Sequence, residues 1–247
     1  MLLIDSRNPK AQEIYTQLAD LVDLSNLPFH LVFGGDGWML ECIHTHGTDL
    51  PYFGINSGHL GFLHNSNADL PHIAQSIKNR DWEIHDFPML HVQGESLHGN
   101  LINAFALNDI YVARMAGVAA NLRMEIDGHL IVDKLICDGI IAATSLGSTA
   151  YSASAGGSPS HPLLSGIHIT PICPHTPRLR PFIIPSTAKI DIEVLHPDRR
   201  RAQVVGDGFS YGEVKQLSIT TATKSTRLVF ANGNNFTERM VRKILRV

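Results

Sequence analysis

One carboxylate among three glycines is the first group in this chain whose type and position suggest chemistry. The segment Leu31–Gly37 reads LVFGGDG, an apolar run that ends in Gly34, Gly35, Asp36 and Gly37. A buried strand that passes through such a turn into a helix leaves backbone N–H groups unpaired at the helix start, and glycine lets a ligand approach the backbone closely. The turn is therefore suited to phosphate groups.

The purpose of Asp36 stays open from this segment alone. A carboxylate beside phosphates repels them unless a metal ion or a proton transfer gives it a role. The alternative is structural, with Asp36 as the N-cap of the following helix. The segment matches neither the P-loop pattern nor the Gly-x-Gly-x-x-Gly dinucleotide fingerprint, so it does not decide between the two.

Three later segments combine glycines or small polar residues with the ends of predicted strands. Residues 52–63, YFGINSGHLGFL, allow close approach to a ligand or form a glycine-rich strand exit. Asn108 and Asp109 in ALNDIYVAR are able to grip sugar hydroxyls, or else they mark a β-bulge or turn. Residues 138–162, DGIIAATSLGSTAYSASAGGSPSHP, surround Tyr151 with small hydroxylated residues. Because a tyrosine ring can stack on adenine, we favour a binding site there.

Composition excludes several other classes of protein. The formal charge is −3 and no basic run is longer than Arg199–Arg201, so we expect no nucleic-acid partner. We find no signal-like start and no stretch long enough to span a bilayer, which predicts a cytoplasmic protein without a membrane partner.

The cysteines and histidines indicate no metal site. Three cysteines share no Cys-x-x-Cys spacing and are expected as reduced, mostly buried thiols: Cys42, Cys137 and Cys173. Three histidines recur at intervals of seven residues and are expected as separate surface or core residues: His161, His168 and His175.

The elements that must position these residues fall into two regions. Residues 1–85 alternate strand-like LLID, FHLVF and PYFGIN with helix-like PKAQEIYTQLADLV and WMLECIHTH, which predicts an α/β domain with a parallel sheet. Residues 86–235 carry short alternating runs between turn residues and predict a β-rich, mainly antiparallel domain. Residues 236–247 return to helical spacing with Thr237 as the expected N-cap, and we expect this helix to pack on the first domain.

Taken in order, these blocks resemble the bacterial NAD kinase family. They are GGDG, GINSGHLGFL, LNDIYV, DGIIAATSLGSTAYSASAGG and TPICPHTPRLRPFIIP, and VVGDGF near Asp207 extends the likeness. The resemblance implies an N-terminal α/β domain, a C-terminal domain of β-sandwich type and a site in the cleft between them. It also implies transfer of the terminal phosphoryl group of ATP to the 2′-hydroxyl of the adenosine ribose of NAD, giving NADP.

The resemblance also implies roles for individual residues. Asp36 would take the proton from the 2′-hydroxyl, and the donor phosphates would lie along Gly34, Gly35 and Gly37. Mg²⁺ or another divalent cation would bridge the phosphate oxygens without a protein cage of its own. A homodimer or homotetramer is implied, with the β domains at the interface. The residues implied to bind the dinucleotide are Gly37, Asn108, Asp109, Asp138, Thr149, Ala150, Tyr151, Ser152, Ala153 and Ser154.

The chain departs from the family pattern at several positions. Asp109 stands where the family has glutamate, Ile136 where many members have a basic residue, and Leu146 where a hydroxyl is common. Trp38 replaces a threonine or a smaller aromatic residue. The first three departures motivate an alternative, a non-catalytic NAD(P)-binding regulator, although Asp36 is retained. A second alternative is another phosphotransferase with a GGDG turn, acting on a lipid or a sugar.

Overall fold

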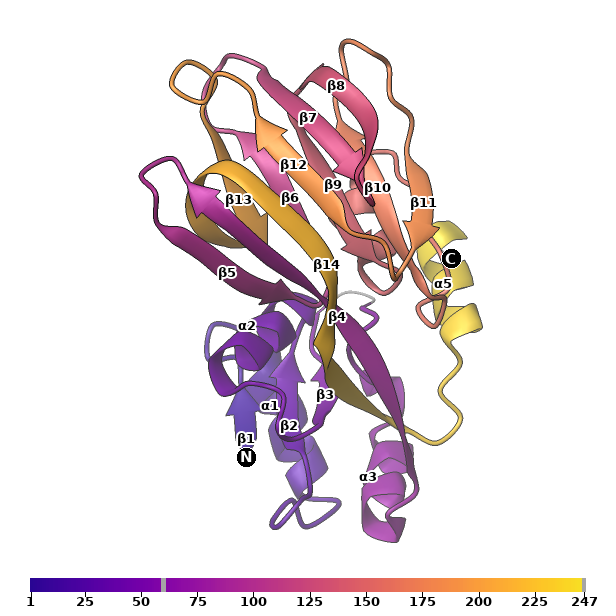
Figure 1. Ribbon diagram of the computed structural model, residues 1–247. Coiled ribbons are helices and arrows are strands. Elements are labelled where there is room, and N and C mark those ends of the chain that lie inside the picture. The colour runs from indigo at the N-terminus through magenta and orange to yellow at the C-terminus, as the bar shows by residue number, and fades with distance from the viewer. Residues whose placement is uncertain (59–60, 246–247) are drawn as a thin grey trace. The chain divides into compact units, whose positions relative to one another are not determined.

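The computed structural model describes residues 1–58 and 61–245 (Figure 1). Contacts divide it into two compact units, the first made of Met1–Phe87 with Ser225–Val247 and the second of Pro88–Lys224. The domain limits expected from the sequence, 1–85 and 86–235, stay a prediction. His59 and Leu60 of the glycine-rich segment, and the last two residues of the expected C-terminal helix, lie outside the described residues.

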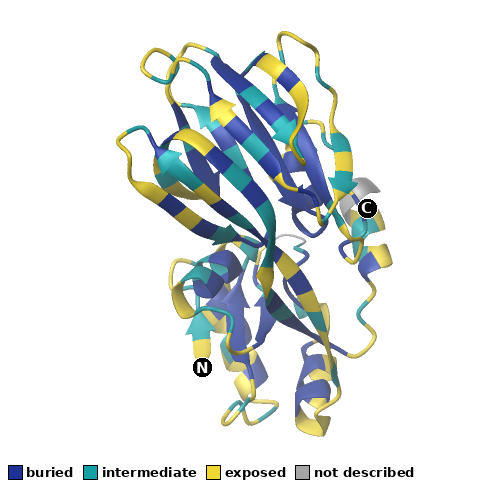
Figure 2. Ribbon diagram, viewed as in Figure 1, coloured by how far each residue is buried: buried dark blue, intermediate teal, exposed yellow. Residues whose placement is uncertain are grey.

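A parallel sheet forms the centre of the first unit. Its order is β1 (Leu2–Ile4), β2 (His30–Gly34), β3 (Tyr52–Asn56) and the end of β14 (Phe209–Ala231), and each neighbouring pair is parallel. β2 is buried along its whole length and β3 almost so, as expected for strands covered on both faces (Figure 2). The predicted parallel α/β arrangement is confirmed.

Helices cover both faces of this sheet. α1 (Pro9–Ala19) and α3 (Leu70–Asn79) share one hydrophobic core with alternate residues of β2 and β3. α2 (Asp36–His46) covers the other face, where the side chain of Met39 lies against Gly54 of β3. A short 3₁₀ turn, η1 (Asn67–Asp69), precedes α3, and neither was expected from the sequence.

Antiparallel strands build the second unit. One sheet has the order β13-β6-β9-β10-β11, and the other joins β5, β4, β14, β12, β7 and β8. Alternate residues of both sheets are buried in one core, so the predicted β-sandwich is confirmed. The strands are β4 (Trp82–Ser96), β5 (Leu101–Ala106), β6 (Asp109–Arg114), β7 (Ala120–Ile126), β8 (His129–Cys137), β9 (Gly139–Thr144), β10 (Gly166–Ile172), β11 (Phe182–Pro185), β12 (Ile190–Val194) and β13 (Ala202–Gly206).

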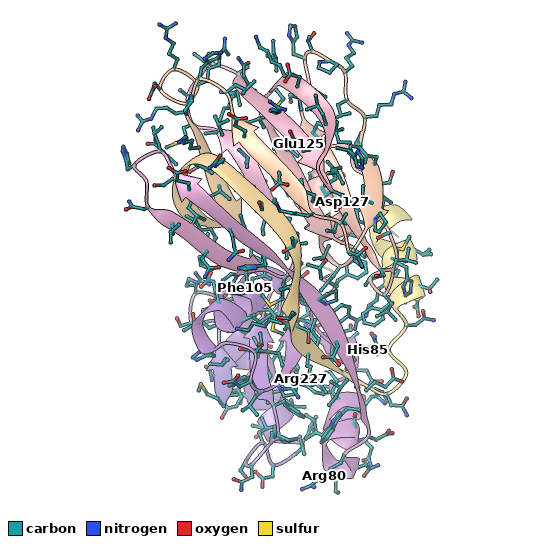
Figure 3. All side chains as sticks on the ribbon, viewed as in Figure 1. Arg80, His85, Phe105, Glu125, Asp127 and Arg227 are labelled. Carbon is teal, nitrogen blue, oxygen red and sulfur yellow. The ribbon has the colours of Figure 1, made fainter. Side chains whose placement is uncertain are left out.

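The C-terminal helix α5 (Phe236–Leu245) packs through its first residue. The ring of Phe236 stands edge-on to the rings of Phe87 and Phe230, with centroids 5.9 and 5.1 Å apart. His85, labelled in Figure 3, stands edge-on to Phe236 at 5.2 Å. These aromatic contacts attach the start of α5 within the first unit.

The start of α5 differs from the sequence expectation. Asn235 accepts a hydrogen bond from the backbone N–H of Glu238 at 3.0 Å and so acts as the N-cap. Thr237, expected as the cap, lies inside the helix. Both residue types are good caps, and only the path of the preceding chain decides which one takes the position.

The cysteines agree in part with their expectation. Cys42 and Cys137 are buried, and burial raises the pKa of each thiol to about 12, whereas Cys173 is exposed. Of the helices within residues 1–58 and 61–245, none has the length and apolar character needed to cross a bilayer.

Candidate functional site

The glycine turn connects β2 to α2 in the first unit. Gly35 is the N-cap of α2 and Asp36 is the first helical residue. The carboxylate of Asp36 accepts hydrogen bonds from the backbone N–H groups of Phe62 and Leu63 at 3.0 and 3.2 Å. The structural alternative considered from the sequence, an N-cap role for Asp36, is therefore wrong.

His64 is a third donor to the same carboxylate. Its Nδ1 lies 3.1 Å from Oδ1 of Asp36. The histidine side chain is fully buried, whereas 28% of the Asp36 side chain is exposed. An ionised Asp36 selects the tautomer of His64 that carries its proton on Nδ1. The carboxylate is therefore held in one orientation while it stays open to a ligand.

The glycines around Asp36 provide space rather than unusual backbone angles. A Cβ at Gly61 would collide with the carboxylate of Asp36. At Gly35 and Gly37 a Cβ would meet no protein atom within 4 Å, so the space beside the turn is open. Gly34, Gly35 and Gly37 all have negative or extended φ angles. Their value is close approach to the backbone, as phosphate binding requires.

In the second unit, an aspartate from another segment holds the chain at the start of β6. The carboxylate of Asp207 accepts hydrogen bonds from the backbone N–H groups of Leu107, Asn108 and Asp109 at 2.6, 2.7 and 3.3 Å. Asp207 lies in the turn between β13 and β14 with a φ of +50°. Its role was missed from the sequence, where VVGDGF counted only toward the family resemblance.

Asp109 is buried at the first position of β6. It is 5% exposed, and burial raises the pKa of its carboxyl to about 7, with the charge of Asp207 acting in the same direction. β6 pairs with β9 in unbroken register from Asp109, opposite Ala143. The β-bulge considered from the sequence is therefore wrong. Asn108, one residue earlier, is partly exposed.

The small-residue segment after β9 folds against Asn108. It forms η2 (Gly147–Thr149) and α4 (Tyr151–Ser154). A Cβ at Gly147 would collide with the backbone of Asn108, so only glycine allows this contact. Oγ1 of Thr144 donates to the carbonyl of Leu107 at 2.8 Å and accepts from the N–H of Gly147 at 3.0 Å. These bonds place Asn108 and the segment 147–154 together.

The expected adenine-binding residues differ in exposure. Tyr151 is 39% exposed, and its ring stands edge-on to that of Tyr111 with centroids 5.1 Å apart. Ser152 is fully buried, and its hydroxyl shares a 2.8 Å hydrogen bond with Thr170. The hydroxyl of Ser152 is therefore bonded within the second unit, and its expected contact with the dinucleotide stays a prediction. The residues at least partly exposed beside it are Thr149, Ala150, Ala153 and Ser154.

Asp138 forms an ion pair within the second unit. Arg114 donates from Nε to Oδ1 and from Nη2 to Oδ2, the latter at 3.3 Å. Each side chain is 35% exposed. Arg114 was missed as a functional candidate although it closes the NDIYVAR block. Of the departures from the family pattern, Leu146 is buried, with 3% exposed, whereas Ile136 is partly exposed and bonds to Thr176 through its backbone, which does not explain its side chain.

Of the three histidines at seven-residue intervals, His168 has a protein partner within the second unit. His168 is buried, and its Nε2 lies 2.9 Å from Oγ of Ser160. Burial lowers the pKa of its imidazole. In the part of the chain that the structure describes, no three His, Cys, Asp or Glu side chains gather in a way that could hold a metal ion.

Comparisons with known proteins agree on one family. The family model described as the ATP-NAD kinase C-terminal domain matches residues 107–242. The NAD kinase of Zymomonas mobilis is 32% identical over 256 residues, covering 100% of this chain and 98% of that protein.

Two solved structures have the same fold. The yeast NADH kinase, crystallised with NADH, has a TM-score of 0.79 and 27% identity, over 89% of this chain and 66% of that chain. An NAD kinase from Archaeoglobus fulgidus, crystallised with ATP, has a TM-score of 0.77 over 100% of this chain and 97% of that chain. Its identity of 24% supports the fold alone.

Proposed function

The chain belongs to the NAD kinase family, and from that premise we propose that it transfers the terminal phosphoryl group of ATP to the 2′-hydroxyl of the adenosine ribose of NAD, with Asp36 as the general base. The observation that carries this assignment is the setting of Asp36. Its carboxylate is oriented by Phe62, Leu63 and His64, is partly exposed, and lies at the edge of an open glycine turn.

The chemical step follows from this setting. Asp36 accepts the proton of the 2′-hydroxyl while the ribose oxygen forms a bond to the γ-phosphorus. The bond between that phosphorus and its bridging oxygen breaks, and the electron pair leaves with ADP. Such a reaction depends on positioning more than on covalent chemistry, and three donors to one carboxylate supply that positioning.

The second unit supplies the groups that hold NAD. The side chain of Asn108 meets the adenosine ribose, and Tyr151 stacks on the adenine beside Thr149 and Ser154. Asp207 fixes the backbone of this segment. The buried Asp109 also contributes to holding NAD, but its side chain is shorter than the glutamate that the family has at this position.

A divalent cation would bind together with the phosphates of ATP. Within residues 1–58 and 61–245 no cluster of three ligating side chains is found, so the ion would be held chiefly by phosphate oxygens and water. It supplies charge neutralisation for the phosphates. The family premise also supports a homo-oligomer and a cytoplasmic location, where NAD and ATP are available.

An Asp36→Asn variant tests the assignment. The amide cannot accept the proton, so we expect NADP formation with ATP, Mg²⁺ and NAD to fall by about 100-fold to 10,000-fold. The dissociation constant of NAD should change little. Asp49→Asn, which alters an exposed aspartate of the same unit, is the matched control and should keep full activity.

Other outcomes of the same assay identify the alternatives. Wild-type protein that binds NAD but makes no NADP with ATP or polyphosphate would be a non-catalytic regulator. Phosphorylation of a lipid or a hexose phosphate in place of NAD would reassign the substrate.

A further inference from the structure

A cavity of about 260 Å³ lies between the loop after β3 and the start of α5, within the first unit. Gly61 and His64, the neighbours of Asp36, form one wall. Arg239 and Arg242 of α5 form another. Neither arginine has a role in the phosphoryl transfer proposed above.

Arg239 is a partly buried cation for which the described residues provide no anionic partner. Its guanidinium lies over the ring of Phe230 at 5.0 Å, and Nη1 donates to the carbonyl of Phe62 at a long 3.4 Å. In the part of the chain that is described, no carboxylate forms an ion pair with it. A guanidinium has five N–H donors, so most of those of Arg239 lack an acceptor among residues 1–58 and 61–245. Charges that are largely withdrawn from water are normally paired, which points to an anion as the partner of Arg239.

Arg242, one turn later, provides a contrast. It pairs with Glu238 at 2.7 Å, and both side chains are more than half exposed. Glu238 is the carboxylate that lines this cavity, and its charge is already balanced by that pair. Burial lowers the pKa of Arg239 to about 10, while the charges of Asp36 and Glu238 act to raise it. Arg239 therefore stays protonated at neutral pH.

The backbone of Phe62 joins Arg239 to the general base. Its N–H donates to Oδ2 of Asp36 and its carbonyl accepts from Nη1 of Arg239. The two backbone polar groups of Phe62 thus bind both the proton acceptor, Asp36, and the cation, Arg239. The group that must approach both during the reaction is the phosphoryl group, because its charge develops on the oxygens next to the attacking hydroxyl.

Asn234 gives a second, independent indication of a ligand. It lines the same cavity, and among the described residues neither its buried Oδ1 nor its buried Nδ2 has a hydrogen-bond partner. Leaving a buried amide unpaired is unfavourable by about 1–3 kcal/mol, so such groups normally have a partner. A phosphate oxygen would accept a hydrogen bond from Nδ2.

We propose that Arg239 binds the phosphoryl group of the donor during transfer, with Asn234 as a second donor of hydrogen bonds. The inference rests on the proposed function and adds the C-terminal helix to the phosphate-binding residues. The planar fork of Arg239 contacts two phosphate oxygens and keeps its own protons throughout. The bond changes remain those of the transfer to the ribose hydroxyl.

Kinetics of Arg239 variants test the role in transfer. Arg239→Ala should lower kcat with ATP by about 1000-fold or more, the effect typical of an arginine that stabilises phosphoryl transfer. The dissociation constant of NAD should be unchanged. Arg239→Lys should recover part of the rate because it keeps the charge but loses the fork. Added guanidinium ion should partly rescue Arg239→Ala. The matched control is Arg80→Ala, a change of an exposed arginine of the same unit (Figure 3).

Binding of tripolyphosphate without NAD provides a readout independent of activity. Calorimetric titration should show that wild type and Arg80→Ala bind equally, that Arg239→Ala binds at least tenfold more weakly, and that Asn234→Ala binds more weakly than wild type. Arg242→Ala should lose less affinity for tripolyphosphate than Arg239→Ala, because Arg242 is already paired with Glu238.

The outcomes separate this inference from the proposed function. Equal kcat and equal tripolyphosphate binding in Arg239→Ala and Arg80→Ala would overturn the inference, even if the wild type makes NADP. Wild type that makes no NADP but binds tripolyphosphate through Arg239 would refute the function and retain the anion site. If Arg239→Ala fails to fold, Arg239→Lys decides, since its aliphatic stem still covers Phe230.

Discussion

At Asp36, two backbone N–H groups and one imidazole converge on a carboxylate that solvent still reaches. A side chain that only capped the helix would instead accept a hydrogen bond from a backbone N–H of the first turn of α2. A general base must present an oxygen atom in one direction, and multiple donors achieve this by removing rotational freedom. His64 is therefore a positioning residue, and it comes directly after the glycine-rich block of residues 52–63.

Asp109 presents the opposite case, a carboxylate that the fold encloses. Its pKa is about 7 in the folded chain against an ordinary value of 3.8. Between these values the folded state binds more protons than the unfolded state, so the free energy of unfolding decreases as pH rises through this window. Above about pH 7 the folded chain carries the full penalty of the buried charge.

Asp109→Asn removes this titration. We expect the variant to gain stability relative to wild type as pH rises from 5 to 8, by about 3 kcal/mol. Thermal or urea unfolding at both pH values measures it. Asp133→Asn, whose side chain is 77% exposed, is the control and should show no such trend. A constant difference between Asp109→Asn and wild type across this range would contradict the raised pKa.

Among the elements, the segment between β3 and η1 depends on one glycine for its contact with α2. A Cβ at Gly61 would collide with the Asp36 carboxylate, whereas a Cβ at Gly58 would have its nearest atoms at 3.6 and 3.8 Å. Gly61→Ala should therefore displace Asp36 and lower kcat at least tenfold, since small misplacements of catalytic groups have large effects. Gly58→Ala, in the same segment, should keep its rate. Circular dichroism checks that both fold, and equal rates in the two variants would show that the Asp36 contact is dispensable.

Local sequence pattern predicts some of the helices and strands and misses others. β1, β2, β3, α1 and α2 were predicted because their apolar spacing is strong over the whole element. α3 was missed, although Asp69 caps it by accepting from the N–H of His72 and Pro71 stands in its first turn. Those are start signals of a helix, but they follow a loop of Asn and Ser residues that reads as a turn.

Across the whole chain, the partners of the site residues are distant in sequence. Phe62, Leu63 and His64 lie 26 to 28 residues after Asp36, and Asp207 lies about 100 residues after the segment that it fixes. Arg239 comes from the last helix. Spacing along a strand or helix carries no information on such pairs, because the path of the loops decides them. Asp36 was therefore predictable as the candidate base, and the groups that position its carboxylate were not.

The whole molecule must bring one NAD molecule into contact with residues of both units if the proposal is right. Binding stabilises the backbone that it orders, so amide hydrogen exchange should slow at Phe62 and Leu63 in the first unit and at Asn108 and Asp109 in the second. A titration of Asp36→Asn with NAD should give one midpoint for both groups of amides. The amides of α1 serve as the internal control and should not change. Protection confined to the second unit at saturating NAD, or two separate midpoints, would show that Asp36 does not act on the ribose held by Asn108.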